Sequence, residues 1–210
     1  MLSIHLDDGK ELQSIYRHIN QDMVKKWYSR GIHAFPIGEV KPSALLPSIA
    51  RGRSGDIHIV PMLWGMTFPP VPGKTTGQFV YELPTDVSPD QKTRLWSFHR
   101  CLVPMSWYYE AEVLFNQTTG KYDPGTGRFL CQPAGSDFSY LACVYHLEEG
   151  YPTFAVCTCS SCMNTFPRMP VIFGKDDVHA WLSPDIHPES LFRHRFMSIV
   201  TDYEAFPASS

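Results

Sequence analysis

Glu110 is the residue of this sequence best placed to transfer protons. It lies in residues 107–111 (Trp-Tyr-Tyr-Glu-Ala), directly after an apolar stretch. Neighbouring aromatic rings would remove a carboxylate from water and raise its pKa. Such a carboxyl group can act as a general acid or base, and Glu112 shares its face if the segment is a strand. The competing interpretation is a structural carboxylate held by backbone groups or by an arginine.

Arg168 is the second candidate, because it lies between two prolines in residues 166–172 (Phe-Pro-Arg-Met-Pro-Val-Ile). Proline fixes its own backbone φ angle, so this turn holds the guanidinium in place. A fixed guanidinium suits a phosphate or a carboxylate. A structural ion pair with an acidic side chain explains the residue equally well.

The densest group of thiols is in residues 157–162 (Cys-Thr-Cys-Ser-Ser-Cys). Three thiolates could meet at one metal, but a tetrahedral zinc site needs a fourth ligand from elsewhere. Apolar residues 154–156 precede the run, which favours small buried side chains in a core strand. We therefore assign no metal and no other cofactor, and we expect the six cysteines to be reduced thiols.

The composition limits the kinds of protein that this chain can be. It has 210 residues, 43% of them hydrophobic and 19% charged, which excludes disorder, collagen and a coiled coil. The 18 prolines and 14 glycines argue against a helical bundle. No run reaches the roughly 18 apolar residues that span a bilayer, and the first residues lack a basic, apolar leader. These features predict a cytoplasmic protein that does not enter a membrane.

The formal net charge of −3 hides an uneven distribution. Residues 1–74 hold nine Lys and Arg against six Asp and Glu, whereas residues 75–210 hold nine against fifteen. A nucleic acid would therefore meet a local basic patch, such as Arg51 and Arg53 in the turn at residues 50–56. An accident of loop composition explains the asymmetry as well.

The spacing of apolar and turn residues predicts one mixed α+β domain over residues 1–205, with a frayed tail at 206–210. Apolar residues recur at three- and four-residue steps between residues 8 and 30, which predicts one helix that Gly31 ends. Strands are expected at 57–64, 101–104, 141–147 and 153–159, a hairpin tip at 116–127, and helices near 88–96 and 175–182.

Three motifs taken together resemble the SOS-response-associated peptidase (SRAP) family. They are residues 61–66 (Pro-Met-Leu-Trp-Gly-Met), residues 100–106 (Arg-Cys-Leu-Val-Pro-Met-Ser) leading to Glu110, and Arg168 to Ile172 followed by Trp181-Leu182. Order and spacing both match, over residues 1 to about 182. The resemblance implies an α+β fold with a barrel-like mixed or antiparallel β core, a few peripheral helices and a groove for single-stranded DNA.

The resemblance also implies a chemistry. In the family, removal of the initiator Met exposes an N-terminal Cys, whose amine and thiol close a thiazolidine on the aldehyde of an abasic site. An Asn, a Glu and a His complete that site, and arginines hold phosphates. Carried over, the Glu falls on Glu110, the Arg on Arg168, and the Asn on His33.

The remaining positions depart from the family. The nucleophile falls on Leu2, which has no thiol and is too bulky for ordinary removal of Met1. The His position is Phe166, and the family's Asn-Ala-Arg strand falls on residues 80–82, so that Glu82 replaces an arginine.

We therefore expect a SRAP-like monomer, bacterial or phage-encoded, that recognises single-stranded or abasic DNA weakly, with cross-linking lost or altered. Arg168, Arg51 and Arg53 would hold phosphates, and Trp64 and Phe68 would stack on bases, although core packing is the competing role for Trp64. The alternative is an inactive SRAP scaffold reused to bind an unidentified protein. A thiol–metal protein is a third, remote reading.

Overall fold

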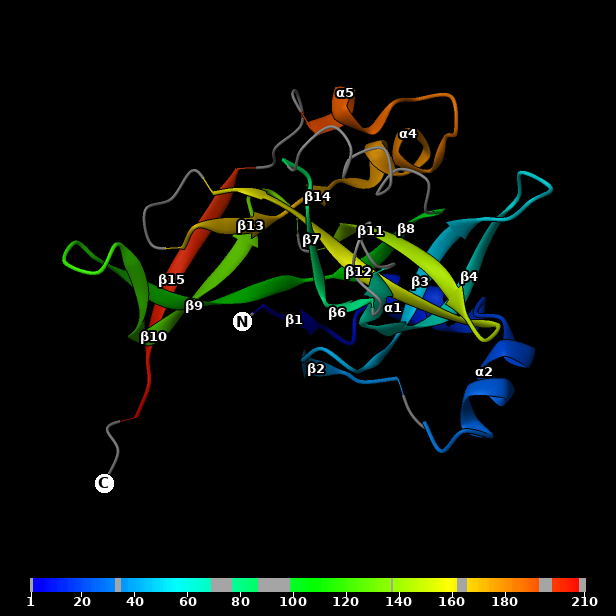
Figure 1. Ribbon diagram of the computed structural model, residues 1–210. Helices are drawn as coiled ribbons and strands as arrows, with labels where there is room; N and C mark the ends of the chain where they lie inside the picture. The colour runs from blue at the N-terminus through cyan, green and yellow to red at the C-terminus, as the bar shows by residue number, and fades with distance from the viewer. Residues whose placement is uncertain are drawn as a thin grey trace.

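A closed ring of β-strands forms the centre of the protein (Figure 1). The computed structural model describes residues 2–32, 35–68, 77–86, 99–136, 138–161, 166–192 and 198–207. Its larger sheet has eight strands in the order β13-β12-β4-β3-β8-β11-β14, with β7 added to β12. Because β12 also pairs with β11, the strands β12, β4, β3, β8 and β11 close on one another. The strands of this sheet are β3 (Leu45–Arg51), β4 (Ile57–Trp64), β7 (Glu82–Pro84), β8 (His99–Met105), β11 (Ser139–Glu148), β12 (Tyr151–Ser160), β13 (Arg168–Pro170) and β14 (Ile172–Phe173).

The ring is a mixed sheet. Strand β12 runs parallel to β4 and β7 but antiparallel to β11 and β13. Closure leaves no free edge between these strands and encloses an apolar core. The predicted α+β class with a barrel-like mixed β core is confirmed.

Large aromatic side chains and thiols fill the ring. Trp64, Phe154 and Trp181 are fully buried, and the Trp181 indole donates to the Cys101 carbonyl oxygen at 2.9 Å. Cys143 and Cys157 are also fully buried, and burial raises the pKa of the Cys157 thiol. Buried polar donors need partners, so this indole bond fixes the register of its helix against the ring.

A second, five-stranded sheet carries the N-terminal strand (Figure 1). Its order is β15-β10-β9-β1-β2, and β1 lies antiparallel to both β2 and β9. This pairing puts the first described residues beside the strand that carries Glu110. The strands are β1 (Ser3–Leu6), β2 (Gly38–Val40), β9 (Trp107–Asn116), β10 (Lys121–Pro133) and β15 (Ile199–Ala205), and a separate pair is formed by β5 (Met66–Phe68) and β6 (Gln78–Val80).

The predicted helix over residues 8–30 is wrong in one respect, because the structure divides it into two. Helix α1 (Lys10–Arg17) ends before Ile19, which bridges to Ile59, and α2 (Gln21–Tyr28) begins after Asn20. The Asn20 side chain accepts a hydrogen bond from the Met23 amide at 2.9 Å and so caps α2. The cap and the bridge together compete successfully with helix continuity.

The remaining helices are short and lie near one end of the ring. They are η1 (Lys175–Asp177), α4 (Val178–Leu182) and α5 (Pro188–Phe192), so the helical signal at 175–182 is confirmed. The helix expected near residues 88–96 falls outside the described residues. No helix in the described part of the chain is both long and apolar enough to cross a membrane.

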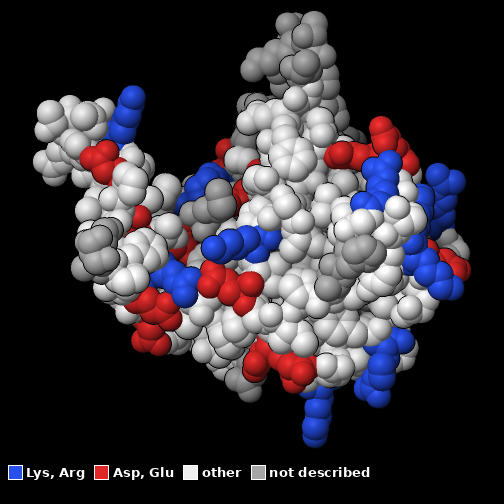
Figure 2. Space-filling model, turned by 90° about the horizontal axis from the view of Figure 1, so that it is seen from below, with Lys and Arg blue, Asp and Glu red and all other residues white. Residues whose placement is uncertain are grey.

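The hairpin tip is tighter than the predicted loop over 116–127. Strand β9 continues to Asn116 and β10 begins at Lys121, with a register shift between Pro124 and Arg128. The turn signals around Gly125 and Gly127 therefore mark a bulge inside β10 rather than a loop. On the face shown in Figure 2, acidic and basic side chains are interspersed.

Candidate functional site

Leu2 lies at a pocket of about 270 Å³ between the two sheets. Its side chain is 1% exposed, and Ser3, which follows it, pairs with Tyr109 of β9. The structure brings the predicted residues Leu2, Glu110 and Arg168 to this one pocket. The full lining is Leu2, Glu82, Glu110, Val113, Thr158, Phe166, Pro167, Arg168, Met169 and Pro170.

Glu110 has the electrostatic setting of a proton-transfer group. Burial raises the pKa of its carboxyl to about 7, the positive terminal amine lowers it, and the Glu82 charge raises it. A carboxyl group with a pKa near neutral pH exists in both protonation states under physiological conditions. The environment expected from the aromatic neighbours is therefore present.

Glu82, rather than Glu112, is the second carboxylate of this pocket. Burial raises the pKa of Glu82, while the terminal amine, the Arg168 charge and a backbone hydrogen bond from Leu2 lower it. Glu112 accepts hydrogen bonds from the Thr126 amide at 2.8 Å and the Tyr203 hydroxyl at 3.0 Å, which gives it a structural role in the β10 bulge. Repulsion between the two negative charges makes it unfavourable for both carboxyl groups to ionise together.

Arg168 is held in a bidentate ion pair at the edge of the pocket. Its Nη2 and Nη1 atoms donate to the two carboxylate oxygens of Asp86 at 2.6 and 3.2 Å, and its Nε donates to the Thr158 hydroxyl at 3.0 Å. Ser160 also donates to Asp86, and the Arg168 hydrogen bond lowers the pKa of Asp86 to about 2. The guanidinium is rigid, as the prolines predicted, but its charge is already matched.

A second arginine, which the sequence analysis did not select, lies on the other side of Leu2. Arg128 lines a hollow of about 210 Å³ with Leu2, and it donates to Glu39 and to Glu204 at 2.8 Å each. Its guanidinium lies 3.8 Å from the centre of the Tyr109 ring. The bulge in β10 sets its position, and no local motif marked that bulge as part of a site.

The other predicted DNA contacts lie away from this pocket. Trp64 is fully buried and donates to the Tyr81 carbonyl oxygen at 3.0 Å, so the idea that it stacks on bases is wrong and core packing explains it. Arg51 donates to the carbonyl oxygens of Leu182 and Gly55, whereas Arg53 is exposed. Phe68 ends β5, and its side chain, like all of His33, lies outside what the structure describes.

The cysteine run does not form a metal centre among the described residues. Cys157 and Cys159 are buried in β12, and no group of three or more His, Cys, Asp or Glu side chains in the described ranges is arranged to hold a metal ion. Cys162 falls outside those ranges. The core-strand interpretation of Cys157 and Cys159 is confirmed.

Comparison with known proteins identifies the family of this chain. The model of the SOS response associated peptidase (SRAP) family matches residues 20–209. The chain belongs to this family. No curated protein matches the sequence of this SRAP chain.

Solved structures share the fold at low sequence identity. A protein from Bacteroides thetaiotaomicron is 15% identical with a TM-score of 0.60, and the match covers 96% of this chain and 90% of that one. A phage-related protein from Bordetella bronchiseptica is 14% identical with a TM-score of 0.65, covering 97% and 94%. Another protein from the same organism is 14% identical with a TM-score of 0.58, covering 98% and 100%. These likenesses support the SRAP fold.

Proposed function

We propose that this SRAP protein binds single-stranded DNA, including abasic strands, at the Leu2 pocket and forms no thiazolidine cross-link there. The observation that carries the proposal is the convergence of Leu2, Glu110 and Arg168 on one pocket. A thiazolidine needs both an amine and a thiol, and the leucine side chain supplies no thiol. Binding would be weak and sensitive to salt, because phosphate contacts release counterions.

Glu110 gives the pocket a remaining chemistry. The terminal amine, whose charge acts on Glu110, can attack the aldehyde carbon of a ring-opened abasic sugar. A carbon–nitrogen double bond then forms as water leaves. A carboxyl group whose pKa is raised to about 7 can donate the proton that the departing oxygen takes up and recover it later. The resulting imine is reversible, unlike a thiazolidine.

The test uses an abasic single strand, an intact single strand and a duplex in mobility-shift assays at low and high salt. We expect the abasic and intact single strands to bind more tightly than the duplex, and binding to weaken as salt rises. Borohydride added to the abasic mixture should trap the imine as a covalent adduct on a denaturing gel. Failure to bind any strand would overturn the proposal, and binding without a trapped adduct would remove the imine step.

A Leu2→Cys variant tests whether the nucleophile is the missing part of the site. We expect it to form an adduct with abasic DNA that survives denaturation without borohydride. Leu114→Cys is the matched control, because Leu114 is 53% exposed on β9 and lies outside the lining of the Leu2 pocket. An adduct of equal yield from both variants would show that any thiol suffices, and would contradict a role for this pocket.

A second candidate function rests on the acidic groups of the same pocket. Asp86 neutralises Arg168, and Glu82 adds negative charge, which weakens attraction for phosphates. These observations favour a SRAP scaffold that binds a protein. This candidate would be favoured if the protein binds no DNA strand in the assays above and its intact mass shows that Met1 is retained.

A further inference from the structure

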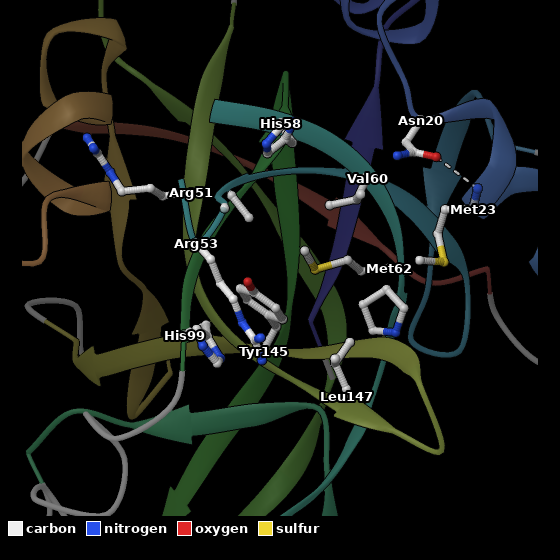
Figure 3. Close-up of a pocket in the computed structure, with 13 residues that line it drawn as sticks. Asn20, Met23, Arg51, Arg53, His58, Val60, Met62, His99, Tyr145 and Leu147 are labelled. Carbon is white, nitrogen blue, oxygen red and sulfur yellow. Dashed lines mark hydrogen bonds between the residues drawn. The ribbon is translucent and has the colours of Figure 1, made fainter. Parts of the chain in front are cut away.

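A larger pocket, of about 450 Å³, lies at the other end of β12 (Figure 3). Pro152 of β12 lines it, whereas Thr158 of the same strand lines the Leu2 pocket. Six residues of extended strand separate the two by roughly 20 Å. The pocket has the size range of small-molecule sites, and the function proposed for the Leu2 pocket does not use it.

One side of this pocket is basic. Arg53 comes from the turn between β3 and β4, His58 lies near the start of β4, and His99 begins β8 (Figure 3). Among the described residues that line the pocket, none is acidic. A second hollow of about 420 Å³ shares Arg53 and His99 with it and adds Arg100. In a chain of net charge −3, this grouping favours an anion.

The other side is apolar and suits a flat ring. Met23 is half-buried and Leu147 is 62% exposed, whereas Met62 is fully buried in the same wall (Figure 3). Thioether sulfurs make favourable contacts with aromatic rings. Tyr145 also lines this wall, with its ring centre 5.1 Å from that of His99, so an aromatic surface adjoins the basic side.

The imidazole of His58 packs against the backbone of the β3–β4 turn. A Cβ atom at Gly52 would lie 2.8 Å from both the Cδ2 and Nε2 atoms of His58, so the imidazole packs directly on the glycine. The Gly52 amide donates to the Asp56 carbonyl oxygen at 2.8 Å, which closes the turn. The imidazole therefore lies against the turn at the edge of the pocket.

We propose that this pocket binds a nucleoside monophosphate group, with its base on the accessible side chains of Met23, Tyr145 and Leu147 and its phosphate on Arg53, His58 and His99. A ligand that is flat and apolar at one end and doubly anionic at the other matches both sides of the pocket. The site is separate from the Leu2 pocket, and its occupancy does not require that DNA bind there. The same chemical group is available as a free nucleotide or as the phosphorylated 5′ end of a strand.

The experiment is a calorimetric titration of the purified full chain with 2′-deoxyadenosine 5′-monophosphate. We expect the nucleotide to bind saturably. Deoxyadenosine and inorganic phosphate should each bind at least about tenfold more weakly, because each lacks one half of the contacts. No saturation up to millimolar nucleotide, or equal affinity for inorganic phosphate, would overturn the proposal.

Variants locate the site. Arg53→Ala and His99→Ala should each weaken nucleotide binding by about tenfold, since a hydrogen bond to a charged group is lost. Arg17→Ala is the matched control, because Arg17 is exposed at the end of α1 and lies outside the pocket lining. Equal binding by all three variants would place the nucleotide elsewhere and refute the assignment.

Single strands with and without a 5′-phosphate distinguish the source. If the protein prefers the phosphorylated strand, and Arg53→Ala abolishes that preference, the ligand is a strand end. If the 5′-phosphate makes no difference while the nucleotide binds tightly, the ligand is a free nucleotide. Borohydride trapping of abasic DNA by the unmodified protein reports on the Leu2 pocket, whereas nucleotide calorimetry reports on this one, so failure of this inference and failure of the proposed function give different results.

Discussion

The Leu2 pocket and the pocket beside the β3–β4 turn differ in how their charges are matched. In the first, Arg168 is paired with Asp86 and two carboxylates face Leu2. In the second, the basic side chains have no acidic partner in the described lining. A site with internally matched charges is rigid and can shift pKa values, whereas one with unmatched charges is free to bind an anion. The protein thus offers one pocket suited to chemistry and another suited to binding.

A charge placed at Leu2 should have the largest effect on the stability of the protein. Leu2→Asp would put a carboxylate at a position that is 1% exposed, close to Glu82 and Glu110. We expect a loss of about 3–5 kcal/mol in the free energy of unfolding, because a buried charge without a partner is added. Urea unfolding measures it. Arg53→Asp, at an exposed position, should change the same quantity by less than about 0.5 kcal/mol, and similar losses in both variants would contradict the difference in burial.

The pH dependence of stability should report Glu110. Its pKa is raised from 4.5 to about 7 in the folded protein, so between these pH values the folded state binds more protons than the unfolded state. Stability therefore falls as pH rises through this window, by about 3 kcal/mol, and levels off above it. Glu110→Gln should remove this part of the pH dependence.

The control for that measurement is Glu149→Gln, because Glu149 has a side chain that is 80% exposed and pairs only at the surface with Arg30. Its unfolding free energy should follow the wild-type pH profile. A Glu110→Gln profile that also matches the wild type would show that Glu110 ionises normally and would withdraw its proposed role in proton transfer.

Removing the partner of Arg168 should make the two pockets more alike. Asp86→Asn would leave the guanidinium with its hydrogen bonds to Thr158 but without a charged partner. We expect single-stranded DNA to bind about five- to tenfold more tightly, and the salt dependence to steepen by about one phosphate contact. Mobility-shift titrations at several salt concentrations measure both. Asp22→Asn, at an exposed site on α2, is the control, and equal gains in both variants would indicate a general charge effect.

The fold was predictable from the sequence where pattern and turn chemistry agreed. The apolar runs around Cys101, Leu141 and Phe154 became the strands β8, β11 and β12 of the ring, close to their predicted bounds. The break at Asn20 was missed because its cause, the bridge from Ile19 to Ile59, joins residues 40 positions apart. Closure of the ring by β11 and β12 likewise depends on long-range pairing.

The site was predictable only in part. The motifs selected Glu110 and Arg168 correctly as members of one pocket with Leu2. They could not show that Asp86 would occupy the Arg168 guanidinium, because those residues are 82 positions apart. Arg128 carried no signal, since the bulge that aims it is set by pairing between β9 and β10. Charge pairing across a sheet cannot be read from local spacing.

The smallest expected effect tests the fit of the β3–β4 turn to its pocket. Gly52→Ala would place a Cβ atom 2.8 Å from the His58 ring, which must move, but that ring is the end of an exposed side chain and can do so at little cost. We expect nucleotide affinity to fall by about two- to threefold and the free energy of unfolding to change by less than about 1 kcal/mol. Gly174→Ala is the control, because its Cβ would meet only an Asp177 oxygen at 4.0 Å. If Gly52→Ala binds nucleotide as the control does, the His58 ring does not contact the phosphate and the binding rests on Arg53 and His99 alone.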